Sequence, residues 1–314
     1  MKPSVSILIP VYNREHLIGE TIQSALSQTF QDHEVIVVDN ASTDGTWDVC
    51  RSFRNKDPRI KIFRNEQNLG PVRNWQRCGQ LAGGTFCKLL FSDDAILPDF
   101  LARTLPLLED EQVGFVFTQT FMGRSMADGK EAFRFLRSTG NHPTKKFIVE
   151  SLSGGDAPFS PGCALFRTED LRKNLLLTIP SPTITDFADH GAGPDLLLYL
   201  KTAWQYPKVG YVAEPLSFFR AHHGSISESA VRPYLLSCYR QAKICFAEQH
   251  FGSYAVKFLL AREWRRERKE SGERIGIEEF KARYSLRNYH LGPLVMLYPL
   301  VGRMARKKLL SFAM

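Results

Sequence analysis

The first hundred residues alternate short apolar runs with stretches of helical periodicity, and this alternation leaves few possible folds. Ile18, Ile22 and Leu26 are spaced by four, which predicts a helix that buries one face. The runs around it are short and rich in β-branched residues, as is typical of buried parallel strands, and they cover residues 5–10, 33–39, 59–64 and 85–91. Strands and helices that alternate at this spacing predict an α/β fold with a doubly wound, mostly parallel sheet and flanking helices.

The pattern also predicts where the individual elements lie. Asn13 is a candidate N-cap for the helix that contains Ile18. Further helices are expected near residues 46–53, 72–81, 99–108 and 195–204, further strands at 113–118 and 209–213, and an irregular segment at 123–141. From about residue 232 the chain is expected to be helical.

Positive charge is concentrated in the last part of the chain. The net charge is +8, with 41 Lys and Arg against 33 Asp and Glu. Residues 231–314 hold 17 of the Lys and Arg but only 7 of the Asp and Glu. This shift predicts a boundary near residue 230, beyond which a basic C-terminal region begins.

The six cysteines form neither a CxxC pair nor a zinc-type spacing, and they lie in mostly apolar stretches. We therefore expect reduced core cysteines and a cytoplasmic protein. The first apolar run is interrupted by Pro10 and is too short for a secretory leader. The longest later run, residues 291–301, is too short to span a bilayer.

Three polar clusters follow predicted strands, at residues 10–13, 39–45 and 92–94. Because ligands bind beyond the carboxyl ends of strands in such sheets, the clusters should converge on one cleft. Neither a GxGxxG after the first strand nor a GxxxxGK[ST] is present, so the usual dinucleotide and P-loop motifs are missing. The adjacent carboxylates of Asp93 and Asp94 repel each other, and Mg²⁺ or Mn²⁺ bridging to phosphate oxygens would relieve that repulsion. The alternatives are an ordinary turn at Asp93-Asp94 and an Asx turn at Asp39.

Four ordered segments carry a family resemblance: Ile7-Leu8-Ile9-Pro10-Val11-Tyr12-Asn13, Val37-Val38-Asp39-Asn40-Ala41-Ser42-Thr43-Asp44-Gly45-Thr46, Asn68-Leu69-Gly70 and Phe91-Ser92-Asp93-Asp94. In this order and spacing they resemble the family 2 glycosyltransferases, which have the GT-A fold. The resemblance is strong over residues 4–100, moderate over 155–227 and weak or absent beyond 235. It implies a nucleotide-sugar-binding half at 1–110, an acceptor-binding half of the same domain at 111–230, and the basic helical region at 231–314.

The resemblance also implies roles for individual residues. Nucleotide binding would fall to Pro10, Tyr12, Asn13, Asp39, Asp44, Asn68, Arg73 and Asp93. Asp94 would bind the Mn²⁺ or Mg²⁺, and His222 would contact phosphate or complete the metal site. Ser92 stands where many relatives carry a further carboxylate, so this sequence departs from the family at that position.

The segment Gly191-Ala192-Gly193-Pro194-Asp195 resembles the family's Gly-x-Gly-Glu-Asp, whose Asp is the catalytic base. Pro194 replaces the usual Glu and suits the first turn of a helix. The resemblance thus assigns the base to Asp195, while a favourable position at a helix N-terminus is the alternative. Asp186 and Asp189 are further candidates in the same loop. Gly162 would form a wall of the acceptor pocket.

The C-terminal region places the apolar residues 289–301 before Arg303, Arg306, Lys307 and Lys308. An apolar face beside basic residues predicts an interfacial helix on the cytoplasmic face of a membrane. Packing on the catalytic domain and a homodimer contact explain the same pattern. Nucleic-acid binding is not expected, because no stacking aromatics or known motif accompany the charge.

Together these features predict an inverting, metal-dependent transfer of a sugar from a nucleoside-diphosphate sugar, with UDP as the favoured nucleotide, to an acceptor hydroxyl. The resemblance and the basic region point to a glycan or lipid-linked acceptor in cell-envelope polysaccharide or glycolipid synthesis. A nucleotidyltransferase would need a Gly-rich basic loop after the first strand, and residues 10–13 are not one. A non-catalytic nucleotide-sugar-binding or membrane-associated scaffold protein is the remaining alternative.

Overall fold

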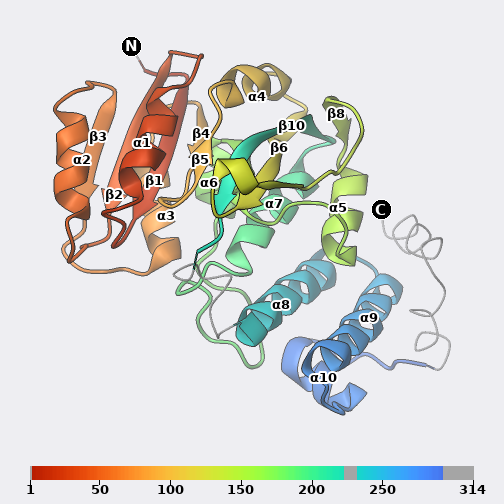
Figure 1. Cartoon of the computed structure of the whole chain (residues 1–314). Coiled ribbons are helices and arrows are strands. Elements are labelled where there is room, and N and C mark those ends of the chain that lie inside the picture. The colour runs from red at the N-terminus through yellow and green to blue at the C-terminus, as the bar shows by residue number, and fades with distance from the viewer. Residues whose placement is uncertain (1, 223–231, 293–314) are drawn as a thin grey trace.

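The computed structural model describes residues 2–222 and 232–292, which form a mixed ten-stranded sheet with helices on both faces (Figure 1). The strands are β1 (Val5–Val11), β2 (His33–Asp39), β3 (Ile60–Arg64), β4 (Phe86–Leu89), β5 (Ala95–Ile96), β6 (Val113–Gly123), β7 (Lys130–Ala132), β8 (Gly140–Pro143), β9 (Ala164–Arg167) and β10 (Lys208–Arg220). The α-helices are α1 (Ile18–Leu26), α2 (Thr46–Arg54), α3 (Pro71–Leu81), α4 (Phe100–Leu108), α5 (Thr144–Ser153), α6 (Thr168–Asn174), α7 (Pro194–Gln205), α8 (Arg232–His250), α9 (Ser253–Ser271) and α10 (Ile277–Tyr284).

The first four strands form the parallel, doubly wound part of the sheet. The strand order is β3-β2-β1-β4-β9-β6-β10-β5, with β7 beside β6 and β8 beside β10. β1 lies parallel between β2 and β4, and β2 lies parallel to β3. The sequence-based prediction of a GT-A-like sheet with flanking helices is therefore confirmed. The carboxyl ends of β1, β2 and β4 meet at one edge, as parallel pairing requires.

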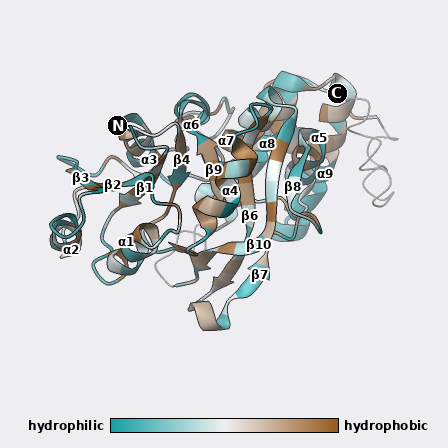
Figure 2. Ribbon diagram, turned by 90° about the horizontal axis from the view of Figure 1, so that it is seen from above, coloured by the Kyte–Doolittle hydropathy of each residue, from teal (hydrophilic) through white to brown (hydrophobic). Residues whose placement is uncertain are grey.

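Alternate side chains of the central strands feed two separate cores, one on each face of the sheet. In β1, Leu8 points to the face covered by α3 and α7, and Ile7 and Ile9 point to the face covered by α1 and α4. Figure 2 shows the apolar strands β6 and β9 in the middle of the molecule, with polar residues on outlying helices such as α2. A sheet buried on both faces needs nearly continuous apolar strands, which explains why all of β1 is buried and why Ser6 is its one polar residue.

The second half of the chain completes the same sheet. β9 lies antiparallel between β4 and β6, and β10 runs parallel to β6 along most of its length. The short β5 pairs antiparallel with the end of β10, through Ala95–Phe218 and Ile96–Ser217. The division at residue 110 remains a prediction, and the sheet itself runs across it.

Two local predictions were wrong. α1 begins at Ile18 after Leu17, and Asn13 instead has a φ of 49° in the preceding loop, where its side chain bonds to another loop. The segment 123–141 is more regular than expected, because it contains a 3₁₀ turn, β7 and part of β8. Both errors arise from contacts with distant residues, which outweigh local preference.

The described part of the C-terminal region, residues 232–292, is mainly helical, as predicted, and α8 packs into the larger core through Leu235, Cys238 and Phe246. Figure 1 shows α8, α9 and α10 grouped on the side of α5 and α7 that faces away from β1–β3. Within residues 2–222 and 232–292, no helix combines the length and apolarity needed to cross a membrane. The apolar residues 293–301 and the basic residues up to Lys308 lie outside the described residues. The membrane, packing and dimer interpretations of that segment stay predictions.

All six cysteines are free and buried, as expected from their apolar surroundings. Burial raises the pKa of the Cys78 thiol well above its usual value, so this thiol stays protonated and packs as a small apolar group.

Candidate functional site

Loops at the carboxyl ends of β1, β2 and β4 contact one another and bring the predicted polar clusters together. Asn13 Oδ1 accepts a hydrogen bond from Thr43 N at 2.9 Å, and Arg14 N donates to Thr46 Oγ1 at 2.7 Å. Arg14 Nε also lies 3.7 Å from Asp93 Oδ2, which joins the third loop. We call Asn13, Arg14, Asp39, Asp93 and His222 the strand-end cluster.

Two of the residues expected to bind the nucleotide, Pro10 and Tyr12, differ in exposure. Pro10 is buried within β1, where it pairs with Val38, whereas the side chain of Tyr12 is 39% exposed just beyond the strand. Of the two, Tyr12 thus presents a ring to solvent at the site, and Pro10 shapes the end of the strand.

Asp39 ends β2 with its carboxylate fully buried. Its Oδ1 accepts hydrogen bonds from the backbone and hydroxyl of Ser42. Its Oδ2 lies 3.1 Å from Arg64 Nε as an ion pair, but no donor has hydrogen-bond geometry toward that oxygen. A buried carboxylate oxygen without a donor is costly, so Asp39 retains the capacity to accept one further hydrogen bond.

Asp44 stabilises the start of α2. Its two oxygens accept from the backbone N–H groups of Thr46 and Glu15, at 3.0 and 3.2 Å. Burial alone would raise the pKa of Asp44, but these hydrogen bonds and the one from the Thr46 hydroxyl have a larger, opposite effect. The pKa of Asp44 therefore lies below its usual value. The hydrogen bonds of the Asp44 carboxylate hold these loops in place, so Asp44 has a structural role.

Buried asparagine side chains shape the loop that carries Asn68. Asn40 Nδ2 donates to Asn68 Oδ1 at 2.7 Å, and Asn68 Oδ1 also accepts from Gly70 N at 2.9 Å. Gly70 has a φ of 81° and precedes α3, where most other residues would be strained. Asn68 therefore fixes the turn that presents Arg73, whose side chain is 43% exposed.

Asp93 and His222 come from distant parts of the sequence and meet at the site. His222 Nε2 lies 2.9 Å from Asp93 Oδ2, and both side chains are partly exposed. His222 lies two residues after β10, whose end is held beside β5. The long strand β10 thus delivers the imidazole to the acidic loop.

Asp94 lies in a different environment from Asp93. It is 8% exposed, and its Oδ1 accepts from Arg220 N at 2.9 Å. Burial and the neighbouring charge of Asp93 raise the pKa of Asp94 well above its usual value. Arg220 binds the loop further, with its Nε donating to Asp93 O at 3.0 Å. Asp94 therefore anchors the loop to β10, and Arg220 is a site residue that the sequence pattern did not reveal.

The residues present are suitable for a divalent cation. Asp93 offers a partly exposed carboxylate, the ligand type that suits Mn²⁺ or Mg²⁺, and His222 offers an imidazole nitrogen beside it. Within the described ranges no group of three or more His, Cys, Asp or Glu side chains is placed to hold a metal. Two protein ligands suffice when water and phosphate oxygens complete the shell.

Asp195 is the second residue of α7 and is buried. Its Oδ1 accepts from Gly193 N at 2.9 Å and from Leu196 N at 2.6 Å. Its Oδ2 accepts from the hydroxyl of Tyr239 at 2.6 Å. Burial raises the pKa of Asp195 to about 7, against the opposing effect of these three bonds. A carboxyl group poised near neutral pH is suited to general acid–base chemistry.

The loop before α7 packs on the start of α3. Ala188 O accepts from Val72 N at 3.2 Å, and Arg73 Nη1 lies 3.6 Å from Asp189 Oδ1. Gly191 has a φ of 74°, and a Cβ there would lie 2.2 Å from the ring of Trp75. The glycine is therefore required for the close approach of this loop to α3. Of the other acidic candidates, Asp189 is exposed, and the side chain of Asp186 accepts from Ala188 N.

Gly162 is buried beneath two aromatic rings. A Cβ there would lie 2.9 Å from Phe219 and 3.3 Å from Phe91. Its carbonyl accepts a hydrogen bond from the buried Lys88 Nζ, which also donates to Leu89 O at 3.1 Å. Burial lowers the pKa of Lys88 to about 8. Gly162 thus lets Phe91 and Phe219 approach closely, and its place in a wall of the acceptor pocket stays a prediction.

Tyr239 and Lys88 give no sequence signal for their roles. Tyr239 lies on α8, 44 positions after Asp195, in a segment that resembles no motif. Arg14 directly follows the motif at residues 7–13. Of the missed residues it was the one that the sequence could most readily have revealed, because a basic residue is a common partner of an acidic cluster.

These features accord with one family. The family model described as glycosyl transferase family 2 matches residues 6–175, more than half of the chain. The chain belongs to this family, as the resemblance implied. It is 36% identical over 225 residues to the glycosyltransferase EpsH of Bacillus subtilis, covering 71% of this chain and 62% of EpsH.

A second relative is the UDP-Glc:alpha-D-GlcNAc-diphosphoundecaprenol beta-1,3-glucosyltransferase WfaP of Escherichia coli. It is 33% identical over 118 residues, which cover 38% of this chain and 46% of WfaP. The chain thus spans about half the length of the curated relatives it matches.

The structure is similar to that of S. aureus TarS residues 1–349 in complex with UDP-GlcNAc. The TM-score is 0.67 at 20% identity, over 88% of this chain and 78% of that one. At this identity the likeness shows a shared fold, and it covers most of the described helices and strands.

Proposed function

We propose that this protein is an inverting glycosyltransferase that moves a sugar from a UDP-sugar to an acceptor hydroxyl. The observation that carries the proposal is the pairing of Asp93 with His222 at the strand ends, together with the buried Asp195 at the start of α7. Family membership, the UDP-sugar donor of WfaP and the UDP-GlcNAc complex of TarS support the choice of nucleotide.

The strand-end cluster would bind the nucleotide. Asp39 has an unused acceptor oxygen, which suits an N–H donor on a base edge. Tyr12 offers an exposed ring for stacking, and Arg73 offers an exposed guanidinium for the diphosphate. Asp44 and Asn68 support these residues by fixing the loops in which they lie.

Asp93 and His222 would hold the metal ion. This differs from the expectation that Asp94 is the ligand, because Asp94 is buried and bonded to Arg220 N. When bound, a divalent cation supplies positive charge that offsets the charge developing on the leaving diphosphate. Arg14, 3.7 Å from Asp93, adds a fixed positive charge to the same corner.

Asp195 would act as the general base. Its Oδ2 accepts the acceptor's proton as the hydroxyl oxygen attacks the anomeric carbon and the bond to the diphosphate breaks. Attack opposite the leaving group inverts the anomeric configuration in a single displacement. Tyr239 and the two backbone N–H groups hold the carboxylate in one orientation before the reaction.

The acceptor we propose is a glycan or lipid-linked sugar of the cell envelope. WfaP acts on a diphosphoundecaprenol-linked sugar, and the basic C-terminal region would suit an anionic membrane surface. A cytoplasmic location, peripheral on the cytoplasmic face of the membrane, is part of this proposal.

The test is calorimetric titration of UDP into the purified protein, first with Mn²⁺ and then with EDTA. Tight, metal-dependent binding followed by turnover in a screen of UDP-sugars and lipid-linked acceptors supports the proposal. Binding without turnover of any donor favours the scaffold alternative. Absence of binding in both conditions overturns the assignment of the nucleotide site.

A further inference from the structure

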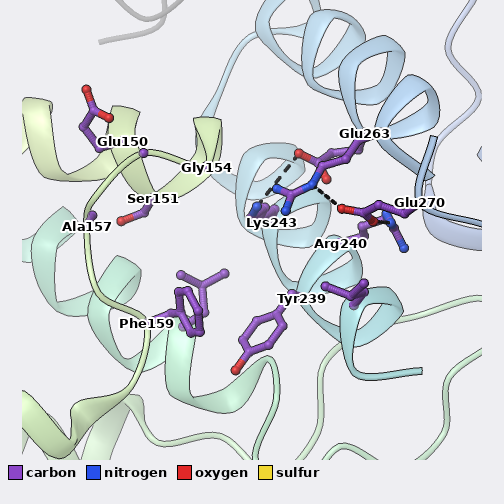
Figure 3. Close-up of a pocket in the computed structure, with 14 residues that line it drawn as sticks. Glu150, Ser151, Gly154, Ala157, Phe159, Tyr239, Arg240, Lys243, Glu263 and Glu270 are labelled. Carbon is purple, nitrogen blue, oxygen red and sulfur yellow. Dashed lines mark hydrogen bonds and ion pairs between the residues drawn. The ribbon is translucent and has the colours of Figure 1, made fainter. Parts of the chain in front are cut away.

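A cavity of about 200 Å³ lies between α5, α7, α8 and α9, away from the strand-end cluster (Figure 3). Tyr239 and Leu196 form part of its lining. Tyr239 also donates its hydroxyl proton to Asp195, and Leu196 is the next residue along α7. The cavity is therefore separated from the proposed base by one side chain.

Polar atoms in the cavity wall lack hydrogen-bond partners. They are Ser151 Oγ, Arg240 Nε and Glu263 Oε1, and each belongs to a residue at least nine-tenths buried. The ammonium of Lys243 faces Glu263 Oε1 at 3.9 Å, which exceeds a hydrogen bond. Leaving such polar groups without a hydrogen bond is costly in free energy, and a polar molecule in the cavity would supply the missing hydrogen bonds.

The charges in the cavity lining balance, because Glu150, Glu263 and Glu270 stand against three basic residues. Arg240 and Arg266 both pair with Glu270, and Lys243 faces Glu263. A charged ligand would have to compete with these internal pairs. A neutral ligand with hydroxyl groups would not, since each hydroxyl both donates and accepts. One hydroxyl could bridge Lys243 and Glu263.

An aromatic surface completes the lining. Phe159 is 45% exposed and packs against Tyr239, with ring centroids 5.1 Å apart. Figure 3 shows both rings on one side and the charged groups of α8 and α9 on the other. A surface with an apolar ring on one side and donors and acceptors opposite suits a sugar ring, which has C–H faces and a hydroxyl edge. The cavity is also much larger than one water molecule, which occupies about 30 Å³ in the liquid.

We propose that this cavity is an acceptor subsite that binds one neutral sugar ring of the glycan, adjacent to the ring whose hydroxyl reacts. The proposal rests on the proposed function, which supplies the reason for a glycan beside Asp195. It gives α8 and α9 a role in acceptor selection, which the strand-end cluster does not share.

The experiment is saturation-transfer NMR on the full chain with the methyl glycosides of glucose, galactose and N-acetylglucosamine. Methyl glucuronoside serves as a charged comparison. Phe159→Ala removes the exposed ring, and Tyr254→Ala is the matched control, because Tyr254 is a 69% exposed aromatic residue outside the cavity lining. UDP binding is measured on the same samples.

At least one neutral glycoside is expected to show ring-proton transfer, about fivefold weaker in Phe159→Ala and unchanged in Tyr254→Ala. Transfer to the glucuronoside should be weaker than to the neutral sugar. The subsite is overturned if all four sugars give no transfer, as for a cavity that holds only water, or if both variants behave alike. If the wild-type protein does not bind UDP, the proposed function is overturned instead. The failure of the subsite and the failure of the proposed function are therefore distinguishable.

Discussion

The strand-end cluster and the Asp195 site hold their carboxylates in opposite surroundings. Asp93 is partly exposed and lies between His222 and Arg14. Asp195 is buried and bonded to Tyr239 and to backbone N–H groups. The first arrangement places a carboxylate beside basic side chains within reach of solvent, whereas the second favours a carboxyl group that gains and loses a proton near neutral pH. In the proposed function, the strand-end cluster supplies the carboxylate that binds a cation and α7 supplies the carboxylate that accepts a proton.

The largest expected effect comes from Asp195→Asn, which removes the proton acceptor and keeps the shape. Transfer should fall about a thousandfold while UDP affinity stays unchanged. The measurement is UDP release in the presence of donor and acceptor. Asp189→Asn is the control, because Asp189 is an exposed residue of the same loop. A large loss in Asp189→Asn and none in Asp195→Asn would transfer the role of base to Asp189.

Next in size is a pH effect on stability. The pKa of Asp195 is raised from 3.8 to about 7 in the folded protein, so the native state binds more protons between these values. Its contribution to stability is therefore fully present below about pH 4, lost as pH rises to 7, and constant above. The loss is on the order of 4 kcal/mol at most.

Asp195→Asn lacks this loss. The Tm of Asp195→Asn minus the Tm of the wild type should increase as the pH rises from 4 to 7. Above pH 7 this difference should stay constant. Differential scanning calorimetry at pH 5 and pH 8 measures this. A Tm difference that is the same at both values would contradict the burial of an ionisable carboxyl group at this position.

Asp93→Asn and Asp94→Asn separate the two neighbouring carboxylates. The Mn²⁺-dependent gain in UDP affinity should fall at least roughly tenfold in Asp93→Asn, since even an outer partner of a metal ligand has that effect. Asp94→Asn keeps an oxygen that accepts from Arg220 N, and the gain should remain. Calorimetric titration of UDP with Mn²⁺ and with EDTA measures this gain in each variant. A gain lost in Asp94→Asn and kept in Asp93→Asn would assign the metal to Asp94.

The smallest effect tests the contact between α8 and the base. Tyr239→Phe removes one hydrogen bond to the Asp195 carboxylate, and the pKa of Asp195 should rise by about one unit. ¹³C NMR of labelled aspartate follows this titration. Tyr234→Phe is the matched control, because the Tyr234 hydroxyl donates to Asp186 O and does not touch Asp195. Equal shifts in both variants would exclude a specific role for Tyr239.

The sequence predicted the strand-end cluster better than the surroundings of Asp195, and the reason is physical. Parallel strands bring their carboxyl ends together, so residues next to a strand end are brought together by the fold itself. Asp39 and Asp93 were found this way. Local reasoning failed for Asn13, because its contact with Thr43 comes from a loop 30 positions away.

The surroundings of Asp195 depend on contacts between distant segments. Nothing at position 239 marks a tyrosine that reaches α7, because α8 buries many apolar and polar residues alike. The distinction between Asp93 and Asp94 likewise required the position of Arg220, which lies on β10. Sequence periodicity predicts which face of an element is buried, but it does not say which distant residue lies opposite.

The pairing of β5 with the end of β10 limits how such proteins can be recombined. An exchange at residue 110 would take Asp93 and Asp94 from one parent and their partners His222 and Arg220 from another. In a chimaera joined at residue 110, both contacts must form between residues from different parents. In a chimaera joined after His222, both partners of each contact come from the same parent. A segment that keeps both contacts therefore spans residues 1–222, roughly twice the length of residues 4–100, where the family resemblance is strong.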